Sequence, residues 1–121
     1  MGKTIMIVED EQHFQDLYKA ILEDTDYRII CAYDGGDAME KLEEKRPDLI
    51  VLDILLNIIT GDTLFLYLKS MPEYAGIPII IVSNVSKSDY TNLMRMDPEV
   101  VFLQKALVCE NLITAIKAKI G

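Results

Sequence analysis

Short apolar runs that end on polar residues constrain the fold of this chain most strongly. Residues 5–8, 49–52 and 79–82 contain only Ile, Leu, Met and Val, and residues 100–103 form a similar run. Such runs are typical of strands that are buried on both faces of a parallel sheet. Open α/β sheets bind ligands beyond the carboxyl ends of their strands, so the residues that follow the runs are site candidates. Those residues are Glu9, Asp10, Asp53 and Ser83, with Lys105 two positions after the last run.

Segments with helical periodicity separate the apolar runs. Apolar residues recur at spacings of three and four in residues 14–22, 64–71 and 109–120, and more weakly in residues 86–96. A further strand is expected at 29–32, and Asp37 is the expected N-cap of the helix that follows the Asp34-Gly35-Gly36-Asp37 turn. Five strands that alternate with five helices predict an α/β fold, a (βα)5 doubly wound parallel five-stranded sheet in the flavodoxin-like order 2-1-3-4-5.

This strand order predicts an acidic site. It makes strands 1 and 3 neighbours, so Glu9, Asp10 and Asp53 would lie close together at their carboxyl ends. Crowded carboxylates repel one another, and a hard divalent cation such as Mg²⁺ relieves that repulsion with oxygen ligands. Asp53 could then act as ligand and as nucleophile. The simpler alternative is that Asp53 caps a helix or faces water, as a single Asp after a strand commonly does.

Composition excludes several classes of function. The 121 residues suit one domain, expected at 1–121, and 12 basic against 20 acidic residues give a formal net charge of -8, which disfavours binding of nucleic acid. No apolar stretch approaches the roughly 20 residues that span a bilayer, so a cytoplasmic protein without membrane contact is expected. Cys31 and Cys109 are expected to be free thiols packed as small hydrophobes, and His13 a surface residue.

The order of motifs along the whole chain resembles the receiver domain of two-component response regulators. The resemblance rests on IMIVEDE, AYDGGDAME, RPDLIVLDI, Gly61, IPIIIVS, and FLQK before a last amphipathic helix. It implies that Asp53 is the phosphoacceptor, which receives a phosphoryl group from a histidine kinase, a phosphotransfer protein or a small acyl phosphate. It also implies an unidentified downstream protein partner.

The resemblance assigns a role to each matching position. Asp10 would bind Mg²⁺ directly, Glu9 would bind it through water, and the backbone carbonyl of Leu55 would complete the protein ligands. Ser83 and Lys105 would hold the phosphoryl oxygens. Phe102 stands where the family places an aromatic switch residue, but it could equally be a fixed core residue. Movement of Ser83 and Phe102 would signal through the face formed by the fourth helix, fifth strand and fifth helix.

The chain departs from the family pattern near these positions. Leu56-Asn57 replaces a common Met-Pro, and Asn84 replaces a small residue. Ala106 replaces a cis proline, and because a non-proline cis bond costs about 2.5 to 4 kcal/mol, a trans Lys105–Ala106 bond and a shifted loop are expected. Leu55 and Val85 are apolar where polar side chains help to place the hydrolytic water, so slow self-dephosphorylation is expected.

Two other functions stay open at this point. One is a receiver-like protein-interaction domain that works without phosphorylation, for which Asn84 and Ala106 leave room. The other is an aspartyl-phosphate phosphatase or phosphotransferase, but such enzymes commonly need a second Asp at the position of Leu55, so a non-enzyme is expected. A dinucleotide or flavin binder is disfavoured because no GxGxxG follows the first run. A homodimer through an exposed helical face is compatible with any of these.

Overall fold

Five parallel strands form one central sheet. The computed structural model describes residues 2–53, 61–84 and 91–121. The strands run in the order β2-β1-β3-β4-β5, and every neighbouring pair is parallel, as the sequence predicted. Their bounds are Thr4–Val8 for β1, Arg28–Ala32 for β2, Leu49–Asp53 for β3, Ile79–Ser83 for β4 and Val101–Gln104 for β5.

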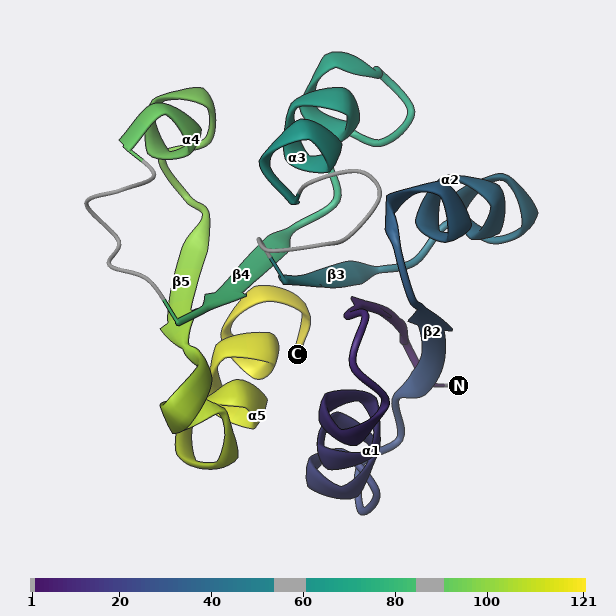
Figure 1. Ribbon diagram of the computed structural model, residues 1–121, viewed down its shortest axis with the longest axis vertical. Helices are drawn as coiled ribbons and strands as arrows, with labels where there is room; N and C mark the ends of the chain where they lie inside the picture. The colour runs from purple at the N-terminus through teal and green to yellow at the C-terminus, as the bar shows by residue number, and fades with distance from the viewer. Residues whose placement is uncertain (1, 54–60, 85–90) are drawn as a thin grey trace.

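Helices cover both faces of this sheet. Figure 1 shows α2, α3 and α4 above the sheet and α1 and α5 below it. The bounds are Gln12–Ile21 for α1, Gly35–Glu44 for α2, Gly61–Ser70 for α3, Thr91–Met96 for α4 and Val108–Ile120 for α5, with a short 3-10 helix, η2, at Lys105–Leu107. The arrangement is the predicted three-layer doubly wound fold.

The two faces of the sheet bury separate apolar cores. Met6 and Val8 of β1 face the core under α2, α3 and α4, whereas Ile5 and Ile7 face the core under α1 and α5. Every residue of β1, β3 and β4 is buried, which explains why their sequences are continuous rather than alternating apolar runs. Burial of each large aliphatic side chain contributes about 1.5 to 3 kcal/mol, so these central strands hold their carboxyl ends firmly in place.

The N-cap of α2 was predicted wrongly. Asp34, not Asp37, precedes the helix in an extended conformation, and its side chain accepts a hydrogen bond from the backbone N–H of Asp37 at 2.7 Å. The Asp37 carboxylate instead accepts from the backbone N–H of Tyr33 at 3.0 Å and pairs with Lys41 at 3.2 Å. Both Gly35 and Gly36 therefore lie inside the first turn of the helix, not in a turn before it.

Smaller differences occur near the carboxyl end of the chain. The last strand is shifted by one residue from the predicted 100–103, and of the helix predicted at 86–96 the structure describes Thr91–Met96, since 86–90 lie outside the described residues. Both cysteines are free as predicted, but Cys109 is exposed while Val108, Leu112 and Ile116 form the buried stripe of α5. Within the described ranges, no helix combines the length and apolar character needed to cross a membrane.

Candidate functional site

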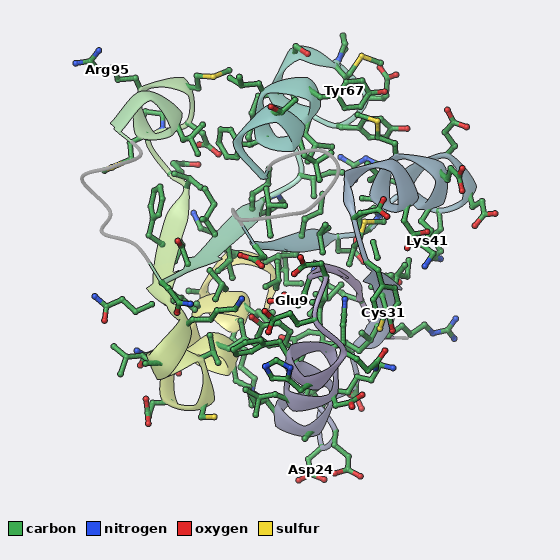
Figure 2. All side chains as sticks on the ribbon, in the orientation of Figure 1. Glu9, Asp24, Cys31, Lys41, Tyr67 and Arg95 are labelled. Atoms are coloured by element: carbon green, nitrogen blue, oxygen red, sulfur yellow. The ribbon has the colours of Figure 1, made fainter. Side chains whose placement is uncertain are left out.

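Three carboxylates meet at the carboxyl ends of β1 and β3. Val8 of β1 lies opposite Leu52 of β3, so the next residues of the two strands, Glu9 and Asp53, emerge at the same level. One oxygen from each of Glu9, Asp10 and Asp53 lies within 4.8 Å of the others. Glu9 and Asp53 are buried, whereas Asp10 is half-buried. Figure 2 places Glu9 near the centre of the molecule, above α1.

Lys105 brings a positive charge to the three carboxylates. Its Nζ lies 2.9 Å from Glu9 Oε1 and donates a hydrogen bond to Asp53 Oδ2 at 3.2 Å. Only 8% of the side chain is exposed. The described residues contain no cis peptide bond, so the predicted trans Lys105–Ala106 bond is confirmed. The lysine nevertheless reaches the acidic residues, because η2 begins directly after β5 at Lys105.

The acidic pocket formed by Glu9, Asp10, Asp53 and Lys105 has more negative than positive charge. Its three carboxylates and one ammonium group sum to a formal charge of -2 when all are ionised. The pKa of Glu9 is raised from 4.5 to about 7, chiefly by burial and also by the negative charge of Asp53, against the opposing effect of Lys105. Burial alone would lower the pKa of Lys105, but its contacts with Glu9 and Asp53 outweigh burial and raise it. The ammonium group therefore stays charged, and the pocket can accept a further cation.

Gln15 supports the backbone under this pocket, a role that the sequence did not reveal. Its Nε2 lies 3.1 Å from each of three backbone carbonyl oxygens, those of Ile7, Glu9 and Ala32. Ile7 and Ala32 lie at the ends of β1 and β2, and Glu9 directly follows β1, so a fully buried amide fixes the chain where Glu9 leaves the sheet. The sequence feature that could have indicated this role is Gln15 itself, a polar residue that directly follows the apolar position Phe14.

Aromatic residues of α1 border the same pocket. The centroid of the Phe14 ring lies 4.1 Å from Lys105 Nζ. The Tyr18 side chain is buried, and both its burial and the negative charges of Glu9 and Asp53 raise the pKa of its phenol. The helical spacing predicted that both residues lie on the inner face of this helix, but it gave no reason to place Phe14 against a charged group. His13 is 72% exposed and contacts Glu11, as expected of a surface residue.

The remaining candidate residues occupy different surroundings. Ser83 ends β4, is buried, and lies opposite Gln104 of β5, the residue before Lys105. Phe102 is half-buried and packs against the core under α2, α3 and α4. Asn84 is exposed. Four other positions discussed above, Leu55, Leu56, Asn57 and Val85, lie outside the described residues.

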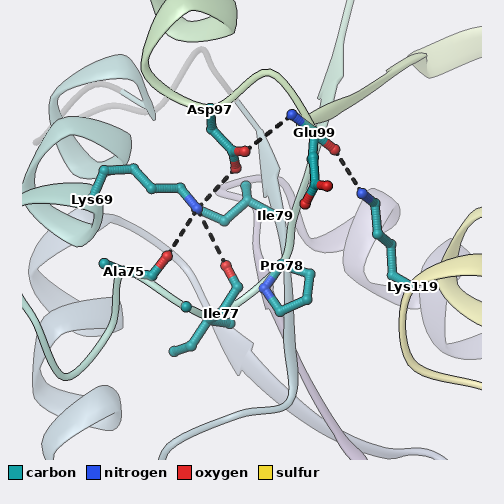
Figure 3. Close-up of a pocket in the computed structure, with 9 residues that line it drawn as sticks. Lys69, Ala75, Ile77, Pro78, Ile79, Asp97, Glu99 and Lys119 are labelled. Atoms are coloured by element: carbon teal, nitrogen blue, oxygen red, sulfur yellow. Dashed lines mark hydrogen bonds and ion pairs between the residues drawn. The ribbon is translucent and has the colours of Figure 1, made fainter.

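A second polar cluster lies at the opposite end of the sheet, beside the start of β4. This far cluster consists of the side chains of Lys69, Asp97, Glu99 and Lys119, which border a cavity of about 270 Å³ (Figure 3). Lys69 Nζ lies 2.9 Å from Asp97 Oδ2, and Asp97 Oδ1 accepts from the backbone N–H of Glu99 at 3.1 Å. Lys119 donates to the backbone carbonyl of Glu99 at 2.7 Å. These contacts join the carboxyl ends of α3 and α5 to the turn that follows α4.

The fold and the acidic pocket together define a class of protein. A parallel sheet in the order 2-1-3-4-5 places its topological switch point between β1 and β3, which is where ligands bind in open α/β sheets. At this point the chain has three carboxylates and a lysine, with a serine at the end of the next strand. This combination is that of a phosphoryl-accepting signalling domain rather than of a nucleotide-binding one.

The chain belongs to the family of response regulator receiver domains, whose family model matches residues 5–117. It is therefore a receiver domain of the two-component response regulator type. A curated relative, the polar-differentiation response regulator DivK of Brucella anthropi, is 30% identical over 121 residues, which are 100% of this chain and 98% of that protein.

Solved structures show the same fold. The receiver domain of the sensor histidine kinase PA1611 from Pseudomonas aeruginosa superimposes with a TM-score of 0.87 at 24% identity, over 100% of this chain and 99% of that one. That protein has a magnesium ion coordinated in its active-site cleft. The Mn²⁺-bound form of response regulator Rcp1 superimposes with a TM-score of 0.78 at 26% identity, over 96% of this chain and 88% of that one.

Proposed function

We propose that Asp53 is the phosphoacceptor of this receiver domain. Its carboxylate is buried at the end of a central strand, between the acidic residues Glu9 and Asp10 and the ammonium group of Lys105. This position between a lysine and two further carboxylates is the observation that carries the proposal. The phosphoryl donor would be a sensor histidine kinase, a phosphotransfer protein or a small acyl phosphate.

The chemistry needs few groups. A carboxylate oxygen of Asp53 attacks the phosphorus of the donor, and the bond from phosphorus to the donor's leaving group breaks. With acetyl phosphate, acetate leaves with the bonding electron pair, and the product is an aspartyl phosphate. Lys105 neutralises the phosphoryl oxygens as a mobile point charge, and the Ser83 hydroxyl donates a hydrogen bond to one of them. The catalytic contribution of the protein is therefore electrostatic stabilisation and positioning.

The residues of the pocket fit a bound Mg²⁺ ion. Glu9, Asp10 and Asp53 offer carboxylate oxygens close together, which are ligands that Mg²⁺ prefers. Burial and the negative charge of Asp53 raise the pKa of Glu9 despite its contact with Lys105, so a further positive charge beside Glu9 would be favourable. A bound Mg²⁺ would supply that charge and would stabilise the negative phosphoryl oxygens. Asp10 and Asp53 would bind it directly, Glu9 through water, and Leu55 through its backbone carbonyl.

Phosphorylation would signal by changing local charge. The phosphoryl group carries about 1.5 to 2 negative charges where the Asp53 carboxylate carried one, and it draws Ser83 and Lys105 toward its oxygens. Ser83 ends β4 and Lys105 follows β5, so their movement would change the face formed by α4, β5 and α5, with Phe102 as a switch residue. That face would bind an unidentified protein partner or a second copy of the chain. In this role, residues 1–121 would act as one receiver domain in the cytoplasm, without nucleic acid or membrane contact.

Mass spectrometry of the intact protein tests this proposal. After incubation with acetyl phosphate and Mg²⁺, the wild type should gain the mass of one phosphoryl group, whereas Asp53→Asn and the wild type in EDTA should not. Asp97→Asn is the matched control, because it alters a carboxylate in the far cluster and should be modified like the wild type. An adduct that persists in Asp53→Asn would refute the assignment. If the wild type gains no adduct from acetyl phosphate or a kinase, the phosphorylation-independent interaction domain becomes the better explanation.

A further inference from the structure

The ammonium group of Lys105 has an aromatic neighbour that its proposed role does not require. Lys105 Nζ lies 4.1 Å from the centroid of the Phe14 ring. The described residues contain two other lysine–aromatic contacts of this kind, Lys69 over Phe65 at 5.7 Å and Lys41 over Tyr33 at 5.9 Å. A cation attracted to an aromatic face gains more when both groups are removed from water. The Lys105–Phe14 contact is the shortest of the three, and it is the one inside the acidic pocket.

From these contacts we propose that Phe14 is a positioning residue that holds Lys105 for phosphoryl transfer. The inference rests on the proposed function of Asp53. An ammonium group has three N–H donors, and its contacts with Glu9 and Asp53 account for two carboxylate partners. The Phe14 ring supplies a third attractive surface that carries no net charge.

An aromatic ring suits this position better than a third carboxylate would. A carboxylate would neutralise more of the lysine charge and would compete with the phosphoryl group for its N–H donors. The ring attracts the cation through its quadrupole and excludes water, but it leaves the positive charge available. Lys105 can therefore exchange the Asp53 oxygen for a phosphoryl oxygen while it stays against the ring.

The Phe14 ring is itself held in place by α1. It lies 4.5 Å from the ring of His13 and 6.3 Å from the ring of Tyr18, both measured between centroids. Tyr18 is buried, and Phe14 packs against the core under α1 and α5. Lys105, by contrast, is the first residue of the short helix η2, and a flexible four-carbon side chain separates its charge from the backbone. A fixed ring on α1 thus restricts a long side chain that comes from the other end of the sequence.

Three substitutions in α1 should differ in their effect on the rate of phosphorylation. Phe14→Leu keeps an apolar side chain but removes the aromatic face, and it should slow phosphorylation of Asp53 by acetyl phosphate roughly fivefold to thirtyfold at saturating Mg²⁺. Phe14→Tyr keeps the face and should restore a rate close to that of the wild type. Leu17→Ala is the control, because it removes apolar contacts from the same helix and the same core, and it should leave the rate within about twofold.

A spectroscopic measurement tests the placement of Lys105 without any phosphorylation. The ε-methylene protons of Lys105 should be shifted upfield by the ring current in NMR spectra of the wild type and Phe14→Tyr. Phe14→Leu should abolish that shift, and Leu17→Ala should retain it. Binding of beryllofluoride, a phosphoryl mimic, should weaken in Phe14→Leu by the same factor as the phosphorylation rate, while the affinity for Mg²⁺ alone should change less than twofold.

The outcomes separate this inference from the proposed function. If the wild type shows no upfield shift, or if Phe14→Leu is phosphorylated as fast as the wild type, the role of Phe14 is refuted. If Leu17→Ala is slowed as much as Phe14→Leu, the effect is one of packing and the positioning role is likewise refuted. If no variant or wild type is phosphorylated but the shift depends on Phe14, the contact is real and the phosphoacceptor role of Asp53 fails instead.

Discussion

Two lysines at opposite ends of the sheet have similar neighbours, but the clusters around them differ in net charge. Lys105 and Lys69 each lie 2.9 Å from a carboxylate oxygen, and each lies within 6 Å of the centroid of a phenylalanine ring. In the acidic pocket, one ammonium group faces three carboxylates. In the far cluster, Lys69 and Lys119 balance Asp97 and Glu99.

The two lysines also differ in their uncharged partners. Lys69 also donates to the backbone carbonyl oxygens of Ala75 at 3.3 Å and Ile77 at 3.5 Å, so its donors are satisfied within the protein. Lys105 has carboxylates and a ring as its described partners. A charge-balanced cluster whose buried lysine is hydrogen-bonded within the protein stabilises a fold, whereas an unbalanced buried pocket is most stable when a ligand completes it. The comparison therefore assigns a structural role to Lys69 and a binding role to Lys105.

The largest effect is expected for Lys105→Ala, which should slow phosphorylation. The same exchange at Lys69 should not, so the pair of variants separates the two roles. Lys105→Ala removes the positive charge next to Asp53 and should lower the rate of phosphorylation by acetyl phosphate about 100-fold or more. Lys69→Ala should leave that rate within about twofold, because its side chain lies at the other end of the strands. Mass spectrometry at timed intervals measures both rates. Equal losses in the two variants would show that the comparison is wrong.

The stability of the protein should depend on pH through Glu9. Its pKa is raised from 4.5 to about 7 in the folded state, so between these values the folded form binds more protons at this group than the unfolded form does. The stability contributed by protonated Glu9 is present below pH 4.5 and is lost as the pH rises through 7. The loss should approach about 3 kcal/mol in EDTA, and saturating Mg²⁺ should reverse it.

Urea denaturation at pH 5 and pH 7.5 measures this dependence. Glu9→Gln removes the titrating group, so its free energy of unfolding should change much less between the two pH values. Lys105 does not oppose the trend, because its raised pKa keeps it charged across this range. A Glu9→Gln variant with the same pH dependence as the wild type would assign the effect to other groups and would contradict the role of Glu9.

Disruption of the far cluster should reduce stability without altering phosphorylation. Lys69→Met keeps the aliphatic stem but removes the ion pair with Asp97, and it leaves two backbone carbonyls without this donor. The free energy of unfolding should fall by about 1 to 3 kcal/mol. A double-mutant cycle with Asp97→Asn should show coupling between the two positions, and additive effects would indicate that the pair contributes little.

The smallest effect is expected for Lys119, which makes one hydrogen bond at the edge of the far cluster. Its side chain is half-exposed and donates to the backbone carbonyl of Glu99. Lys119→Ala should lower the free energy of unfolding by about 0.5 kcal/mol or less, because water can replace the lost donor. A loss as large as that for Lys69→Met would show that the far cluster depends on both lysines equally.

The strands and the acidic residues at their ends could be predicted because they depend on local sequence, while the strand order was predicted as a common arrangement of alternating strands and helices. Central parallel strands are buried on both faces, so β1, β3 and β4 are uninterrupted apolar runs, and Glu9, Asp53 and Ser83 stand at their ends. The parallel register then brings these residues together without further information. Lys105 was found by the same reasoning although β5 is only half-buried.

Other features depended on choices that the sequence leaves open. Asp34 and Asp37 both suit an N-cap, and the extended backbone at Asp34 decides between them. Phe14 fits an apolar helical stripe whether its ring meets the core or an ammonium group, so its contact with Lys105 needed coordinates. The Lys69–Asp97 pair joins residues that are 28 positions apart in the sequence. The two segments share no periodicity, so no local pattern predicts the pair.

The exposed thiol of Cys109 offers a built-in attachment point for a fluorescent reporter. Cys109 is the second residue of α5, four residues after Lys105, on the helix that continues from η2. The only other cysteine, Cys31, is half-buried in β2, so a maleimide dye should label Cys109 first. A dye at this position would sit next to the turn that carries the lysine, so its emission could follow occupancy of the pocket in real time in the otherwise unaltered chain.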